Sequence, residues 1–100
     1  MSVFDIPKDA ARVLRELTGE ARPEVALQLA LRDAAAYRLE RIKAEIGIFE
    51  NRYGMTFEEY RRRWESEDRD EDYTWDAERD YLEWESLEGR GRCLRETLVG

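Results

Sequence analysis

The residues from 23 to 53 set the strongest limit on what this chain can fold into. The run opens with Pro23, which suits the first turn of a helix, and contains no second proline before Gly54, a residue that favours a helix end. At 1.5 Å per residue it predicts one helix of about 46 Å. Apolar residues recur along it at steps of three and four, which places them on one side of a helix. They are Leu27, Leu31, Ala35, Leu39, Ile42, Ile46, Phe49 and Tyr53.

Three further segments show helical patterns. A short helix is expected at about 8–17, because Gly19 follows it as a stop. The sequence TFEE at 56–59 is typical of a capping box and predicts a second short helix at about 57–66. Apolar residues at steps of three and four predict a last, long helix at about 73–98.

These patterns predict an all-α fold. Charged residues make up 41% of the chain and there are only two prolines, which favours long helices with water-facing sides over a β-sandwich or barrel. We expect one domain over residues 1–100, in which the helices 23–53 and 73–98 form a long antiparallel hairpin. The short N-terminal helix and the short connecting helix complete it. The apolar side of the long helix is extensive for a chain of 100 residues, so a dimeric bundle is expected, with a homodimer as the assembly.

The charge is distributed unevenly. The first 63 residues hold 12 Lys and Arg against 11 Asp and Glu, whereas the last 37 hold 5 against 13. A nucleic-acid-binding protein normally has the opposite sign, because Lys and Arg supply the affinity for phosphate. Direct binding to nucleic acid is therefore disfavoured, and the short basic run at 61–63 is interpreted as a solvated helix face. A basic partner protein fits the acidic half better.

Cysteine and histidine usage limits the chemistry and the compartment. Cys93 is the only cysteine and there is no histidine, so an intrachain disulfide and the usual zinc ligand sets are excluded. The first residues carry no basic start followed by an apolar run, and no apolar stretch is long enough to span a membrane. We expect a cytoplasmic protein with no membrane association and no cofactor.

Acidic residues of the last helix are candidates for catalytic or metal-binding groups. Asp76, Asp80 and Glu83 have the spacing of one helix face, but a Mg²⁺ site generally needs ligands from a second element. The all-α nucleotide pyrophosphatases carry an ExxE motif before an ExxD motif, and here the ExxD-like 65–68 precedes the ExxE at 85–88. No catalytic, cofactor-binding or metal-binding residue is predicted. A Mg²⁺-dependent nucleotide hydrolase is kept as a minor alternative.

The aromatic residues of the same region divide into two groups. Tyr81 and Trp84 belong to the apolar side of the last helix and are expected in the core. Tyr73 and Trp75 lie off that side; they either form a binding surface, as exposed aromatics ringed by charge often do, or cap the end of a small core. The sequence predicts a partner-binding surface with five members. They are Tyr73, Trp75, Asp76, Asp80 and Glu83.

Two segments carry a resemblance to a known family. They are NRYGMTFEEYRRRWE, at residues 51–65, and DYTWDAERDYLEWESL, at residues 72–87. With Tyr53 to Glu59 forming the turn, and Asp80, Tyr81, Glu83, Trp84 and Glu85 following in the last helix, the chain resembles a family of small, acidic, all-helical archaeal and bacterial proteins. Genes of that family lie beside genes for small toxin-like proteins. The resemblance implies an antitoxin-like, partner-binding role and supplies no catalytic residue.

The leading functional hypothesis is accordingly a non-enzymatic protein–protein interaction module. It would act as an antitoxin-like inhibitor that binds a basic partner, the product of a neighbouring gene, through an acidic helical surface. The alternative is a self-associating structural helical protein.

Overall fold

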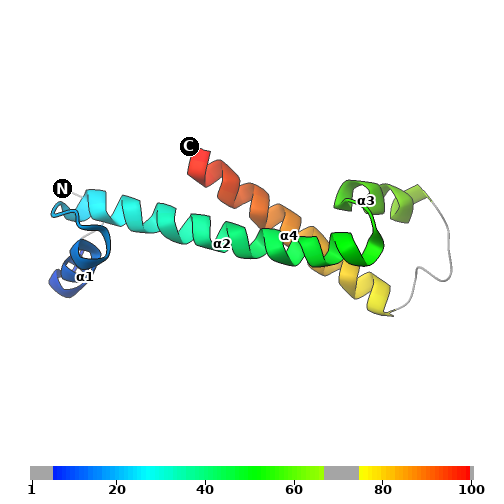
Figure 1. Ribbon diagram of the computed structural model, residues 1–100, viewed down its shortest axis with the longest axis horizontal. Helices are drawn as coiled ribbons and strands as arrows, with labels where there is room; N and C mark the ends of the chain where they lie inside the picture. The colour runs from blue at the N-terminus through cyan, green and yellow to red at the C-terminus, as the bar shows by residue number, and fades with distance from the viewer. Residues whose placement is uncertain (1–5, 67–74, 100) are drawn as a thin grey trace. The chain divides into compact units, whose positions relative to one another are not determined.

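The all-α prediction is confirmed. A computed structural model describes residues 6–66 and 75–99, and these residues form helices and short connections with no strand. The bounds of the helices agree with the predicted ones to within one residue, apart from the predicted start of the last helix at about residue 73, which lies outside the described residues. The helices are α1 (Lys8–Thr18), α2 (Pro23–Tyr53), α3 (Phe57–Ser66) and α4 (Trp75–Val99) (Figure 1).

Contacts along the chain define two compact units, and the division falls inside α2, between Tyr37 and Arg38. The first unit contains α1 and the beginning of α2. The second contains the rest of α2 together with α3 and α4. The single domain, the hairpin along the full length of α2 and the homodimer stay predictions.

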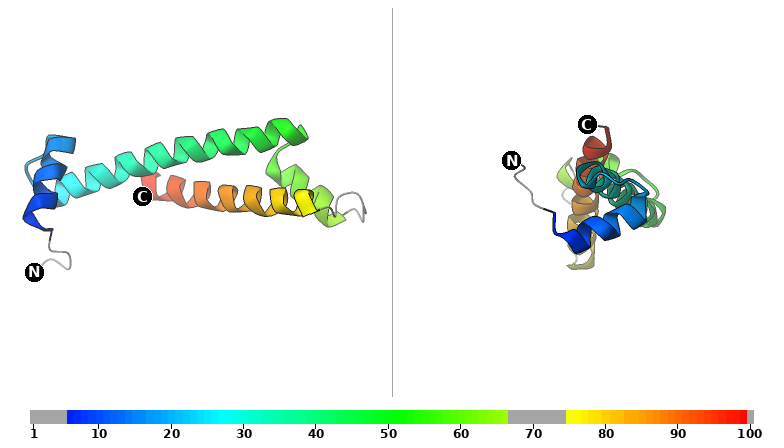
Figure 2. Two further views of the ribbon diagram at one scale, coloured as in Figure 1. Left: turned by 90° about the horizontal axis from the view of Figure 1, so that it is seen from below. Right: turned by 90° about the vertical axis from the view of Figure 1, so that its left-hand side faces the viewer.

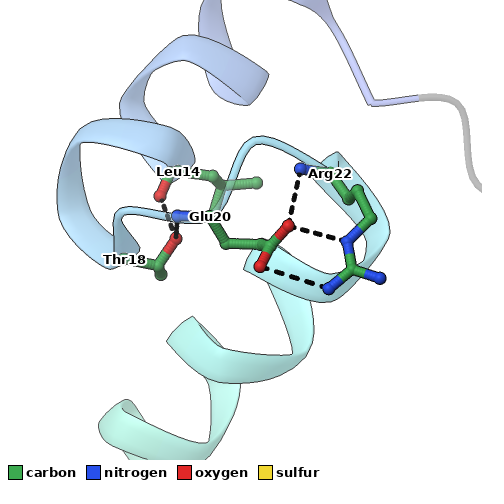
Figure 3. Close-up of polar contacts among 4 residues, drawn as sticks. All are labelled: Leu14, Thr18, Glu20 and Arg22. Atoms are coloured by element: carbon green, nitrogen blue, oxygen red, sulfur yellow. Dashed lines mark hydrogen bonds and ion pairs between the residues drawn. The ribbon is translucent and has the colours of Figure 1, made fainter.

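The turn between α1 and α2 is held by side chains of its own residues (Figure 3). Gly19 ends α1 in the left-handed region at φ 74°, as the sequence predicts. Thr18 Oγ1 donates to the carbonyl oxygen of Leu14 at 2.7 Å and accepts from the amide of Glu20 at 3.2 Å. Arg22 donates to the Glu20 carboxylate from its backbone amide at 3.1 Å and from its guanidinium at 2.7 and 3.3 Å. These local bonds fix the direction in which α2 leaves α1.

A second glycine turn joins α2 to α3. Gly54 has φ 67°, a conformation that side chains with a Cβ rarely adopt, and its amide donates to the carbonyl oxygen of Glu50 at 2.7 Å. Two residues later the hydroxyl of Thr56 accepts from the amide of Glu59 at 3.3 Å. This is the N-terminal bond expected of the TFEE sequence, and it begins α3 immediately after α2 has ended.

Within the second unit, α4 packs against α2 in the opposite direction (Figure 2). A Cβ added at Gly91 of α4 would lie 3.4 Å from Cγ2 of Ile42, so the glycine lets the two helices approach closely. Seven residues later in α2, Phe49 stacks on Trp84, which lies seven residues earlier in α4, with ring centroids 5.6 Å apart. The partners therefore run in opposite order along the two helices.

The core of the second unit is aromatic. Trp84 is 0% exposed, and its ring centroid lies 5.3 to 5.8 Å from four other rings. These rings belong to Phe49 and Tyr53 of α2 and to Phe57 and Tyr60 of α3. Trp84 thus joins α4 to both neighbouring helices, and the prediction that it belongs to the core is confirmed.

None of the helices within residues 6–66 and 75–99 combines the length and the apolar character that crossing a bilayer requires.

We expect truncation of Trp84 to destabilise the second unit strongly. Trp84→Ala should lower the free energy of unfolding by about 3 to 5 kcal/mol, because it removes a wholly buried ring and leaves a cavity. Trp84→Phe should cost much less, since it keeps an aromatic ring. Urea titration followed by circular dichroism measures the difference.

The matched control is Trp75→Ala, because Trp75 is 76% exposed. Its effect on the free energy of unfolding should stay within about 0.5 kcal/mol, as is usual for surface positions. Equal losses of unfolding free energy in Trp84→Ala and Trp75→Ala would contradict the central position of Trp84 in the core.

Candidate partner-binding surface

The structure places the five residues of the predicted surface in different environments. Trp75 begins α4 and is 76% exposed, and Asp76 and Glu83 are also exposed. Asp80 is buried, at 8% exposure. Tyr73 lies outside the described residues. The exposed part of the predicted surface is therefore smaller than expected.

Asp80 does not lie on the surface that the sequence predicts, because its side chain faces the neighbouring helix α2. Its Oδ2 accepts a hydrogen bond from the hydroxyl of Tyr53 at 2.5 Å. The same oxygen accepts a hydrogen bond from Nη1 of Arg52 at 2.8 Å and forms an ion pair with it. The guanidinium of Arg52 also lies over the ring of Phe49, 5.2 Å from its centroid. A sequence signal was available: Asp80 precedes Trp84 by four residues and so shares its core-facing side.

The pKa shifts of Asp80, Tyr53 and Arg52 favour a stabilising contact between α4 and α2 over a role in proton transfer. Burial opposes the charge of Asp80, but the hydrogen bonds from Tyr53 and Arg52 outweigh it and hold the pKa of the carboxyl below its usual value. Burial, followed by the hydrogen bond to Asp80, raises the pKa of the Tyr53 hydroxyl well above its usual value. The bond to Asp80 likewise raises the pKa of Arg52. All three groups therefore keep one protonation state around neutral pH.

The beginning of α4 offers an aromatic ring beside carboxylates. The side chain of Asp76 is 81% exposed, and Arg79 Nη2 approaches its Oδ1 at 3.5 Å on the helix surface. Asp76 and Glu78 lie in the first turn of the helix, where the helix dipole stabilises negative charge. Trp75 and these acids can contact a basic protein surface without any change in the core.

A further acidic site was missed by the sequence reasoning. In the second unit, a hollow of about 570 Å³ is lined by glutamates that come from three helices. These are Glu50 of α2, Glu58 of α3, and Glu85 and Glu88 of α4, and Arg61 and Arg92 also line it. We call it the acidic hollow. Only the pair of glutamates in α4 is visible as a pattern in the sequence; the other two approach it because α2, α3 and α4 share the aromatic core.

Within the described part of the chain, no three Cys, Asp or Glu side chains are grouped so that they could hold a metal ion. Of the ExxD-like segment 65–68, residues 67 and 68 lie outside the described residues.

The buried carboxylate generates a pH-dependent prediction. Asp80→Asn should lower the free energy of unfolding at pH 7 by about 1 to 3 kcal/mol, since hydrogen bonds to a charged group are lost. Asp80 binds its proton less readily in the folded than in the unfolded chain, so its contribution is full above the unfolded pKa of about 3.9 and is lost as the pH falls through the folded pKa.

The difference between wild type and Asp80→Asn should accordingly shrink when urea titrations are repeated at decreasing pH below about 4. Asp33→Asn, at an exposed position of α2, removes the same charge and should change the free energy of unfolding by less than about 0.5 kcal/mol at pH 7. If the difference in free energy of unfolding between wild type and Asp80→Asn stayed constant down to the lowest pH tested, it would contradict a stabilising role for the ionised carboxylate of Asp80.

Comparison with family models, with curated proteins and with solved structures gives no match for this chain. The family resemblance of residues 51–65 and 72–87 therefore stays a hypothesis.

Proposed function

We propose that this chain is a non-enzymatic protein–protein interaction module that binds a basic partner protein through the beginning of α4. The contact residues are Trp75 and Asp76, with Tyr73 preceding them in the sequence. Asp80 contributes from inside the fold, by holding the second turn of α4 against α2.

The observation that carries this proposal is the exposure of Trp75. The other two aromatic residues of α4 pack into the core of the second unit, with Trp84 fully buried and Tyr81 stacked on Trp64 at 5.1 Å between ring centroids. Trp75 instead keeps 76% of its surface in contact with water. Tryptophan is among the residues that contribute most to protein–protein interfaces, because burying its large ring releases much water.

The charge around this tryptophan supports a basic partner. Between Glu65 and Glu88 the sequence holds 12 Asp and Glu against two Arg. A dense negative surface speeds the encounter with a cationic protein and disfavours neutral or acidic ones. The acidic hollow lies in the same unit and offers a second negative contact.

The biological role that we propose is antitoxin-like: the chain would inhibit the basic product of a neighbouring gene by covering its cationic surface. The resemblance of residues 51–65 and 72–87 supports this role. An acidic inhibitor can compete with nucleic acid for a cationic groove because both carry negative charge.

Co-expression with the product of the adjacent gene tests the proposal. The two proteins should copurify at about 0.05 M salt and separate more readily at about 0.5 M, because salt screens exposed charges. Calorimetric titration should show that Trp75→Ala/Asp76→Lys weakens binding about thirtyfold or more, which corresponds to a hot-spot loss of about 2 kcal/mol.

A matched double variant in α2 controls for the loss of one exposed apolar side chain and the reversal of one exposed acid. Leu31→Ala/Asp33→Lys makes both changes, and Leu31 is 55% exposed. It should bind as the wild type does. Unchanged affinity in Trp75→Ala/Asp76→Lys, or no association at low salt, would overturn the proposal.

A further inference from the structure

Two adjoining hollows lie between α2 and α4 within the second unit, and the first reaches the edge of the Trp84 core at Phe49 and Leu87. The first, of about 410 Å³, is bounded by Glu45 and Ile48 of α2 and by Glu83 of α4. The second, of about 820 Å³, includes Arg38 of α2 and Arg92 of α4. Ser86 and Arg90 line both hollows, which makes them one continuous surface. We call it the outer groove.

Charge changes sign along the outer groove. In α4, acidic Glu83 precedes basic Arg90 by seven residues, which is close to two helical turns and keeps both on one side of the helix. In α2, basic Arg38 precedes acidic Glu45 by the same interval. Because the two helices run in opposite directions, with Ile42 beside Gly91 and Phe49 beside Trp84, the order along the groove is Glu83, Glu45, Arg90 and Arg38. These two acids therefore lie toward one end and both arginines toward the other, where Glu96 is the acid among the lining residues of the second hollow.

The groove also combines exposed apolar side chains with open space. Ile48, which lines the first hollow, is 57% exposed, and Leu82, the neighbour of Glu83 in α4, is 56% exposed. Toward the basic end, a Cβ added at Gly89 would meet no atom within 4 Å, and the small side chain of Cys93 is exposed. Large apolar side chains at one end and unfilled space at the other are complementary to each other, as in helix pairs that pack knobs into holes.

The outer groove has acids and large apolar side chains toward one end, and arginines and small residues toward the other. A second copy turned end for end therefore brings unlike ends together. We propose that the outer groove is a self-association surface, on which a second copy of this chain packs with its α4 antiparallel. A twofold axis beside Ser86 brings Glu83 of each copy next to Arg90 of the other, and Leu82 near Gly89. A parallel arrangement would place Glu83 beside Glu83 and Arg90 beside Arg90, which is unfavourable.

This surface differs from the one that the sequence suggests for a dimer. The apolar side of α2 is covered within the second unit, where Leu39, Ile42 and Phe49 are all less than 9% exposed. Little of that part of the helix is left for another copy. The proposal also assigns Glu83, one of the five residues of the predicted partner-binding surface, to contact between copies.

Charge exchange between two single variants tests the proposal. Glu83→Arg presents arginine at both positions and Arg90→Glu presents glutamate at both, so each variant alone should have the mass of a monomer in sedimentation at about 0.05 M salt, where the wild type is a dimer. Mixed in equal amounts, the two variants should form a heterodimer, because each contact then joins opposite charges. The double variant Glu83→Arg/Arg90→Glu should recover the homodimer.

A monomeric wild type at low salt would overturn the proposal, and so would a dimer that neither single variant weakens. Circular dichroism of each variant verifies that the helices are formed. Neither substitution alters Trp75 or Asp76, so binding of the basic partner can be measured on the same variants and the two proposals are tested separately.

Cross-linking at single cysteines tests the position of the axis. With the axis beside Ser86, Cys93 lies seven residues from it, so the two copies of Cys93 are about 21 Å apart along the helices and cannot form a disulfide. Ser86→Cys/Cys93→Ser moves the only cysteine to the axis and should give a disulfide-linked dimer on mild oxidation. Faster linkage through Cys93 than through position 86 would contradict the antiparallel register.

Discussion

The packing of Trp84 against rings from two other helices is the interaction on which the second unit depends. A lone helix of 25 residues such as α4 gains little stability from its backbone bonds in water and needs an apolar contact to be held in place. Trp84 supplies that contact with both α2 and α3, and the turn at Gly54 brings those two helices together around it. The stack has offset and tilted rings, which are the favourable arrangements for aromatic pairs.

The cluster of Asp80, Arg52 and Tyr53, one turn away from Trp84, fixes how α4 is aligned along α2. An aromatic core alone tolerates small shifts of one helix along another, because rings contact each other in many orientations. Asp80 accepts from Arg52 and Tyr53 in only one alignment of α4 with α2, and a shift would leave its carboxylate buried without donors. This alignment also decides which acids approach one another in the acidic hollow and which charges face outward along the outer groove.

The helices could be predicted from the sequence, since Pro23, Gly19, Gly54 and the TFEE sequence are local signals that act within a few residues. The core role of Trp84 followed from the apolar spacing of its own helix. The position of Asp80 was predicted wrongly, because exposed and buried carboxylates look alike until the donors of another helix are known. The acidic hollow and the outer groove were missed for the same reason: each depends on how α2 and α4 align, and no spacing within one helix contains that information.

The two tryptophans of α4 have different roles in this account: Trp84 holds the fold, and we propose that Trp75 binds a basic partner. The chain has three tryptophans, so the indole N–H signals of a ¹⁵N-labelled sample can be assigned by substitution. Titration with the product of the adjacent gene should shift the Trp75 signal progressively while the Trp84 signal stays in place. A saturating titration that leaves Trp75 unchanged, or that shifts Trp84 instead, would contradict the account.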